Sequence, residues 1–238
     1  MDPVIARIRQ DLAGLADEQT RTTMQRFFKE SIEGYGVKTP VVSALAKKYW
    51  KEIRHREKGE IFALCEELYR SKKIEESFVV STWAYALSDR FEMADLAVFR
   101  GWIDTYITNW ASCDGFCNHA LGEFFERYPA CMDELRVWAG SENRWMRRAA
   151  AVSLIVPAKH GKFLPEAIGI ATLLLTDNDD MVQKGYGWLL KEASRKHIRE
   201  VFDFVMQNKK VMPRTALRYA IELMPKDLKV EAMKKEGK

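Results

Sequence analysis

A tryptophan and an aspartate one helical turn apart are the first candidates for chemistry in this 238-residue chain. Asn109 can cap a helix, and Trp110 and Asp114 then fall at positions i and i+4 on one face of it. An aspartate in this setting could be a carboxylate held in a partly apolar groove. Spacing alone favours a simpler interpretation, in which Asp114 is a first-turn aspartate stabilised by the helix dipole.

A second tryptophan lies inside a basic stripe. In the predicted helix 179–195, four side chains share one face at positions i, i+4, i+7 and i+11, namely Lys184, Trp188, Lys191 and Arg195. Large aromatic residues are avoided on faces that only meet water, so the stripe suits a groove that holds a phosphate backbone and offers an aromatic surface. The alternative is a core tryptophan flanked by solvated charges.

Two more predicted helices carry cations near their N-terminal halves. These are Arg144, Arg147 and Arg148 in helix 143–156, and Arg214 and Arg218 in helix 213–223. Helix N-termini favour anions through their dipole and their free N–H groups, so basic side chains placed there reinforce phosphate binding. The alternative is a basic surface that only meets solvent.

The net charge of +4 conceals an asymmetry along the chain. Residues 1–140 carry 19 basic and 22 acidic side chains, whereas residues 141–238 carry 19 basic and 12 acidic ones. The basic excess is therefore confined to the C-terminal part, which points to a polyanionic partner for that part.

Helices must position these residues. The chain has only 13 glycines and 7 prolines, too few for the many tight turns of an all-β fold. Almost every segment instead shows the amphipathic periodicity of a helix. The predicted helices span 3–15, 18–33, 40–53, 59–71, 74–88, 93–107, 110–128, 131–139, 143–156, 163–175, 179–195, 197–207, 213–223 and 226–235.

The helices recur in pairs. The segments NRWMRRAAAVSL and DDMVQKGYGWLL are alike. The dipeptide Arg148-Ala149 in the first and the dipeptide Lys184-Gly185 in the second lie 36 residues apart. Segments that begin near positions 110, 144, 181 and 213 keep about this period. A two-helix unit of ~35–45 residues is typical of HEAT-like repeats. We therefore expect an all-α, HEAT-like α-solenoid of six or seven antiparallel helix pairs with a concave basic groove, as one domain over residues 1–238.

Other kinds of site are not indicated. Cys113, Cys117 and His119 lack the usual spacing of zinc ligands and a second ligand pair, and no glycine-rich nucleotide motif or catalytic triad is present. We therefore expect no metal and no cofactor. The sequence has no apolar run of 18 residues, so we expect no membrane span. Four cysteines and a start that is unlike a signal peptide favour a reducing cytoplasm.

In their order and spacing, the motifs resemble those of the AlkD-type DNA alkylation repair family, whose members are HEAT-like, all-helical DNA glycosylases of similar length. The resemblance covers essentially the whole chain. It rests on Tyr35-Gly36-Val37-Lys38-Thr39-Pro40, on Trp110-x3-Asp114, on Arg147-Arg148 after Trp145, and on Val182-Gln183-Lys184-x2-Gly187-Trp188-x2-Lys191-Glu192.

The resemblance implies roles for individual residues. Asp114 matches the family's catalytic aspartate, and Arg148 matches an arginine that approaches the DNA backbone. Trp110 and Trp188 match the two tryptophans that flank the sugar of the lesion nucleotide. Family members often have arginine where Lys191 stands, and a lysine there keeps the charge but loses the bidentate phosphate fork. The residues between Trp110 and Asp114 are also small here, and a cysteine precedes the aspartate.

The activity that the resemblance implies is monofunctional hydrolysis of the N-glycosidic bond of cationic alkylated purines, 7-methylguanine and 3-methyladenine, in duplex DNA. Asp114 would stabilise the oxocarbenium-like sugar as the base departs. The protein would act as a monomer in the cytoplasm, associated with the nucleoid if the source is prokaryotic. Two alternatives stay open. One is a non-catalytic paralogue that binds branched or distorted DNA, and the other is a HEAT-type adaptor that binds a protein.

Overall fold

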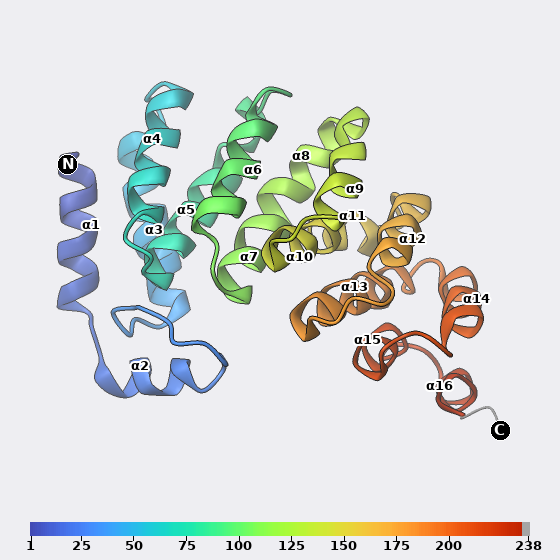
Figure 1. The fold of residues 1–238 in the computed structure, drawn as a ribbon. Helices are drawn as coiled ribbons and strands as arrows, with labels where there is room; N and C mark the ends of the chain where they lie inside the picture. The colour runs from blue at the N-terminus through green and yellow to red at the C-terminus, as the bar shows by residue number, and fades with distance from the viewer. Residues whose placement is uncertain (235–238) are drawn as a thin grey trace. The chain divides into compact units, whose positions relative to one another are not determined.

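The computed structural model describes residues 1–234, which are predominantly helical (Figure 1). These residues form no β-strand beyond a single isolated bridge between Glu33 and Lys73. The prediction of an all-α fold is therefore confirmed. The chain divides into two compact units, Met1–Ala120 and Leu121–Lys238, each with its own hydrophobic core. The expectation of one domain over residues 1–238 stays a prediction.

The first unit contains seven α-helices and one short 3-10 turn. They are α1 (Pro3–Gly14), α2 (Glu18–Gln25), α3 (Thr39–Ile53), α4 (Lys58–Tyr69), α5 (Ile74–Ala86), the 3-10 turn Ser88–Arg90, α6 (Asp95–Tyr106) and α7 (Trp110–Phe116). A π-helical turn, Cys117–Leu121, follows α7. The predicted helix 110–128 is thus interrupted by a turn of a kind that is often found beside functional sites.

The second unit begins with α8 and is helical as far as the structure describes it. Its elements are α8 (Gly122–Arg127), the 3-10 turn Pro129–Cys131, α9 (Asp133–Ala139), α10 (Arg144–Val152), α11 (Ile155–Lys159), α12 (Leu164–Leu173), α13 (Asp180–Ala193), α14 (Ile198–Asn208), α15 (Arg214–Ala220) and α16 (Lys226–Met233). The end of the predicted helix 226–235 lies outside the described residues.

Helices recur at the predicted spacing. The starts of α3, α5, α7, α10, α13 and α15 follow one another at intervals of 34–36 residues. In the first unit α5 packs between α3 and α7, and α4 packs against α6. In the second unit α13 packs between α10 and α15, while α9 packs against α12 and α14 against α16. Both units therefore have two layers of helices, which agrees with the predicted HEAT-like repeats.

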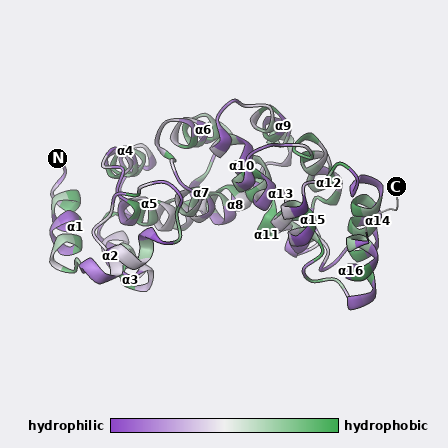
Figure 2. Ribbon diagram, turned by 60° about the horizontal axis from the view of Figure 1, so that its bottom comes forward, coloured by the Kyte–Doolittle hydropathy of each residue, from purple (hydrophilic) through white to green (hydrophobic). Residues whose placement is uncertain are grey.

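Each unit buries the apolar faces of its helices, whose residues alternate in hydropathy along the chain (Figure 2). In the first unit an aromatic cluster joins α4, α6 and α7, where Phe99 contacts the rings of Phe62, Trp102 and Phe116 edge-on or tilted. In the second unit Phe125 meets Trp138 edge-on. Ring pairs of this geometry contribute beyond their buried area, so the cores hold the helices in a fixed register.

Two further predicted helices are broken or end early in the structure. The predicted helix 143–156 breaks between α10 and α11, because the ring of Pro157 would clash with the carbonyl of Ser153 in a continuous helix. The predicted helix 18–33 was wrong after Gln25, where α2 ends. There the Gln25 amide donates to the Glu30 carbonyl at 2.9 Å and accepts from the Ile32 N–H at 3.0 Å, which closes a non-helical turn.

A buried carboxylate holds the segment that follows α2. Glu75, in the first turn of α5, is 0% exposed and accepts hydrogen bonds from the backbone N–H groups of Tyr35, Gly36 and Val37 at 3.0, 2.8 and 3.0 Å. Gly36 has a φ of +83°, a conformation that favours glycine. A Cβ at Gly34 would lie 2.8 Å from a Glu75 oxygen, so the segment can approach the carboxylate only because position 34 is glycine.

The neighbouring Glu76 carboxylate reinforces this arrangement. It is also 0% exposed, accepts from the Tyr35 hydroxyl at 2.8 Å, and pairs with Arg9 of α1 at 3.0 Å. Burial and the Glu76 carboxylate raise the pKa of the Tyr35 hydroxyl, which therefore stays protonated and donates. The two adjacent glutamates tie α1, α5 and the α2–α3 segment together.

We predict that Glu75→Gln lowers the free energy of unfolding by about 1–3 kcal/mol, because an amide NH₂ replaces one accepting oxygen and leaves a buried N–H without a partner. The measurement is the midpoint of urea unfolding. Glu123→Gln, which makes the same change at an exposed position of α8, is the control and should leave the midpoint unchanged. Equal midpoints for the two variants would contradict the structural role of Glu75.

Candidate functional site

The predicted pair Trp110 and Asp114 lies on α7, in the first unit. Asn109 caps this helix as predicted, and its side chain accepts from the Ser112 N–H at 2.9 Å. Ser112, Cys113 and Phe116 form the buried face, on which the Ser112 hydroxyl lies 2.7 Å from that of Ser77 in α5. Trp110 and Asp114 are both half-buried, one turn apart.

The α2–α3 segment holds the Trp110 ring from two directions. The indole Nε1–H donates to the backbone carbonyl of Phe27 at 3.3 Å. The ring itself stacks on Phe28, with centroids 5.2 Å apart and planes inclined by 19°. An indole restrained in this way is pre-positioned for a ligand, since little side-chain freedom is left to lose on binding.

Phe27 and Phe28 were not among the predicted site residues. Phe27 is 70% exposed, which is unusually high for a large aromatic residue. Two adjacent aromatic residues in the sequence could have indicated a site here. Because they fall inside the predicted helix 18–33, that prediction treats them as part of the helix. Only the end of α2 at Gln25 brings them beside Trp110.

In the second unit α13 carries Trp188 and lies between two helices at close range. Glycines on opposite sides of α13 allow this, because residues two apart in a helix point about 200° apart. A Cβ at Gly185 would lie 3.3 Å from the Arg148 side chain of α10. At Gly187 it would lie 2.8 Å from the Ala216 carbonyl oxygen of α15. Trp188 itself is half-buried.

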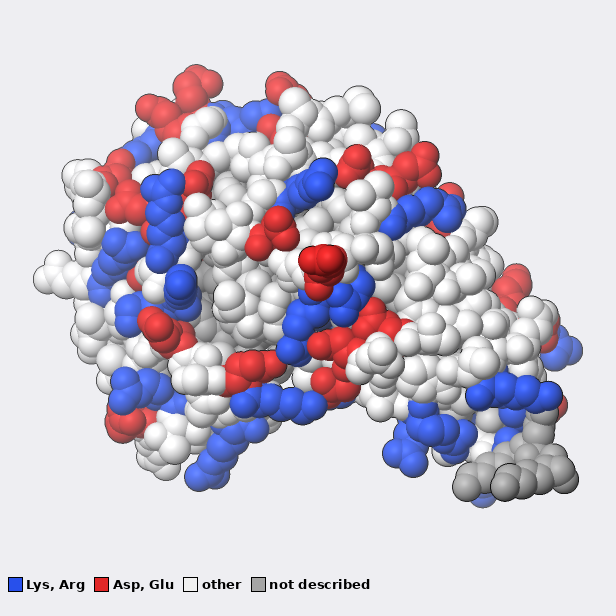
Figure 3. All heavy atoms as spheres, viewed as in Figure 1, with Lys and Arg blue, Asp and Glu red and all other residues white. Residues whose placement is uncertain are grey.

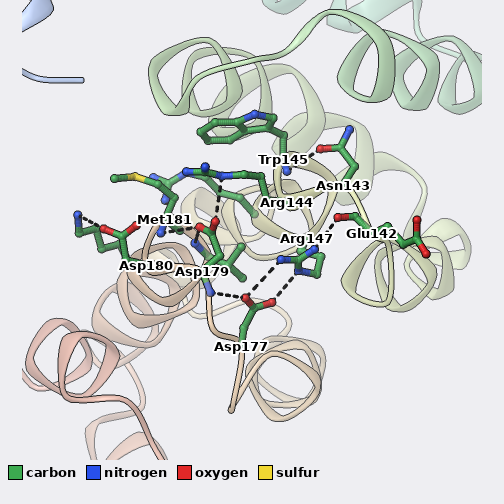
Figure 4. Close-up of polar contacts among 12 residues, drawn as sticks. Glu142, Asn143, Arg144, Trp145, Arg147, Asp177, Asp179, Asp180 and Met181 are labelled. Atoms are coloured by element: carbon green, nitrogen blue, oxygen red, sulfur yellow. Dashed lines mark hydrogen bonds and ion pairs between the residues drawn. The ribbon is translucent and has the colours of Figure 1, made fainter. Parts of the chain in front are cut away.

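The arginines of α10 reach across to the turn before α13 (Figure 4). Arg144 pairs with Asp179 at 3.0 Å, and its guanidinium lies 4.6 Å from the centroid of the Trp145 ring. Arg147 pairs with Asp177 at 2.6 Å and donates to the carbonyls of Ser141 and Glu142 at 2.9 Å each. These side chains therefore connect two repeats of the same unit.

Asp179 has a second function as the N-cap of α13, where its side chain accepts from the N–H groups of Met181 and Val182. Arg148 is 4% exposed and donates to the Met181 carbonyl. The α10 arginines and the α13 cap thus form one polar network. The predicted contact of these arginines with DNA stays a prediction.

The remaining predicted cations lie on or just after α13 and on α15. Lys184 pairs with Asp180 at 3.1 Å and Lys191 with Glu222 at 2.7 Å. Arg195 lies beyond the end of α13, exposed, and pairs with Glu192 at 2.6 Å. Basic and acidic side chains accordingly lie interspersed over the face shown in Figure 3. Each of the three cations of the predicted stripe thus has a carboxylate partner within the protein, and Arg195 lies outside the helix.

On α15 both predicted cations are exposed. Arg214 donates to the Met233 sulfur at 3.4 Å. Arg218 has no ion-pair partner within residues 1–234. Of the basic residues predicted in this unit, Arg214 and Arg218 have no carboxylate partner among residues 1–234, so their charges are open to an incoming anion.

The structure brings the predicted residues together in two groups. Trp110 and Asp114 share α7 in the first unit. Arg148 lies across Gly185 of α13, the helix that carries Trp188, in the second. In neither group do the described residues include three metal-ligating side chains clustered as a metal site would require. No helix within residues 1–234 has the length and apolar character to span a bilayer.

Comparison with known proteins identifies the family. A family model for DNA alkylation repair enzyme matches residues 8–224, and the chain therefore belongs to the DNA alkylation repair enzyme family. A solved structure described as a predicted DNA alkylation repair enzyme from Enterococcus faecalis has the same fold, with a TM-score of 0.80 and 20% identity. The match covers 89% of this chain and 97% of that one. A search of curated proteins found no match.

We predict that Arg147→Ala lowers the free energy of unfolding by about 2–3 kcal/mol, because it removes a largely buried ion pair and two hydrogen bonds from a charged group. Thermal unfolding followed by circular dichroism measures this. Arg218→Ala removes an exposed arginine of the same unit and should leave the transition unchanged. If Arg147→Ala unfolds at the same temperature as the wild type, the network does not stabilise the unit.

Proposed function

We propose that the protein is a monofunctional DNA glycosylase that hydrolyses the N-glycosidic bond of cationic alkylated purines, 7-methylguanine and 3-methyladenine, in duplex DNA. One observation carries the proposal. A carboxylate, Asp114, lies one turn from a tryptophan whose ring is held by Phe27 and Phe28. Membership of the DNA alkylation repair enzyme family supports the substrate class.

The chemistry asks little of a general acid. Alkylation at N3 or N7 gives the purine a positive charge, so the base leaves with the electron pair of the bond to C1′ and becomes neutral. The sugar then carries the positive charge. The Asp114 carboxylate stabilises that charge and orients a water molecule, which adds to C1′ and loses a proton. No lysine needs to form a Schiff base, and the reaction ends with an abasic site.

The tryptophans complement the carboxylate. An indole face attracts a cation, so Trp110 favours the transition state over the neutral sugar of the ground state. Its restrained ring adds to this effect, because the enzyme does not have to order it during the reaction. The proposal keeps for Trp188 the role that the family resemblance assigns it, contact with the sugar of the same nucleotide.

The basic residues of the second unit bind the DNA backbone in this proposal. The set comprises Arg144, Arg147, Arg148, Lys184, Lys191, Arg195, Arg214 and Arg218. Because carboxylates pair with most of them, phosphate must compete with an internal partner. At these residues a hydrogen bond to phosphate replaces one to a carboxylate, so no charge-assisted bond is gained. We therefore assign a larger share of the DNA affinity to Arg214 and Arg218, which have no such partner within the described residues.

We predict that Asp114→Asn reduces the rate of 7-methylguanine release at least about a hundredfold, the usual effect of losing one electrostatic stabiliser of a transition state. The affinity for undamaged duplex DNA should stay within about threefold, since the carboxylate acts on charge that develops only during the reaction. Single-turnover release from methylated DNA and fluorescence anisotropy measure the two quantities.

Asp203→Asn is the matched control, because it makes the same change on an exposed face of α14. It should release 7-methylguanine at the wild-type rate. Release by Asp114→Asn at that rate would remove Asp114 from the mechanism. A wild-type protein that binds DNA but releases no base would instead support a non-catalytic DNA-binding protein.

A further inference from the structure

A pocket in the first unit is outside every site described so far, and we infer that it binds a phosphodiester group of the DNA strand. The inference rests on the proposed function, since DNA supplies the phosphodiester. The pocket has a volume of about 580 Å³ and is bounded by the second half of α2, by residues 32–34 and by the start of α5. Basic side chains are prominent around α2 in the space-filling view (Figure 3).

The lining of this pocket selects an anion. Three cationic side chains, Arg21, Arg26 and Lys73, face a single carboxylate, that of Glu33. Among the lining residues Ile32 supplies the one large apolar side chain. A pocket of this size for an apolar ligand would be lined mainly by hydrophobic and aromatic groups.

The cations of the pocket are poorly neutralised by the protein itself. Arg26 is exposed and has no ion-pair partner among residues 1–234. The Lys73 ammonium lies 4.5 Å from the centroid of the Tyr35 ring, so an aromatic face rather than a carboxylate holds it. Arg21 pairs with Glu18 at 2.5 Å, but both side chains are more than half exposed, and such pairs contribute little.

The walls of the pocket are already in place without a ligand. The two hydrogen bonds of Gln25 close the turn that follows α2. Beyond the turn, the Glu75 carboxylate fixes residues 35–37, which follow the pocket residues 32–34 directly. Little ordering is therefore required on binding, which favours a small, weakly held group such as one phosphate.

The position of the pocket along the chain favours a DNA strand over free phosphate. Arg26 directly precedes Phe27, whose carbonyl accepts the Trp110 N–H. The pocket and the indole therefore share one segment of the first unit. Phosphate contacts set the register of a protein on a duplex without reading its sequence. A phosphate held by Arg26 and Lys73 would fix where the strand passes Trp110.

The test combines Arg26→Gln with Lys73→Gln and measures binding to undamaged duplex DNA by fluorescence anisotropy between about 50 and 200 mM salt. Because both cations hold the same phosphate, losing that contact should reduce the slope of log K against log salt by about one, which corresponds to about tenfold weaker binding near 0.1 M salt. Glu33→Gln should change affinity in the opposite direction, because it removes the one carboxylate of the pocket.

Arg100→Gln is the matched control, since Arg100 is an exposed arginine of α6 in the same unit. It should leave the slope unchanged.

If the wild-type protein binds DNA and the double variant shows the same salt slope, the inference is overturned and the proposed function still stands. Titration with inorganic phosphate, followed through the Arg26 side-chain NMR signal, separates the two sources of the anion. Saturation by phosphate together with an unchanged DNA slope would assign the pocket to the free ion and also overturn the inference. Absence of base release by a wild type that binds DNA would contradict the proposed function alone.

Discussion

The first unit depends on one buried charge, the carboxylate of Glu75 at the start of α5. A buried carboxylate is costly unless hydrogen bonds replace its water, and here three consecutive backbone N–H groups do so. They come from residues 35–37 of the segment between α2 and α3, which the carboxylate holds in place. The first part of that segment, which follows the end of α2 at Gln25, places Phe27 and Phe28 against Trp110. One buried side chain thus fixes residues 35–37, which explains why a Tyr-Gly-Val sequence stands before α3.

The second unit relies on close approach and on charge. Gly185 and Gly187 let α13 approach α10 on one side and α15 on the other. The α10 arginines then span the gap and bind the carboxylates of the α13 cap. Because the cap aspartate Asp179 is held by Arg144, a ligand that drew Arg144 away would also weaken the start of α13. In the proposed function, DNA binding by Arg144 would therefore be linked to the local stability of α13.

The sequence was sufficient to predict the features that depend on local periodicity. The all-α fold, the repeat of about 36 residues and the Asn109 cap follow from hydrophobic spacing and capping chemistry, and the structure confirms them. Hydrophobic spacing did not predict where α2 ends, because the Gln25 side chain closes the turn there by hydrogen bonds to the backbone of Glu30 and Ile32. Nor could it predict which arginines are paired, since the partner carboxylates of α10 come from the next repeat. Polar contacts decide both features, and hydrophobic periodicity carries no information about them.

The pairing of charges also changes what the uneven charge distribution means. The C-terminal part has the basic excess, yet carboxylates already neutralise Arg147, Lys184 and Lys191. A cation that is neutralised internally releases fewer counterions when it meets a phosphate, so it contributes less to salt-dependent affinity than its charge implies. The acidic N-terminal part, by contrast, contains Arg26, which has no ion-pair partner within residues 1–234. The surface that attracts a polyanion is therefore set by the cations that the fold leaves unpaired, and these need not lie where the net charge is highest.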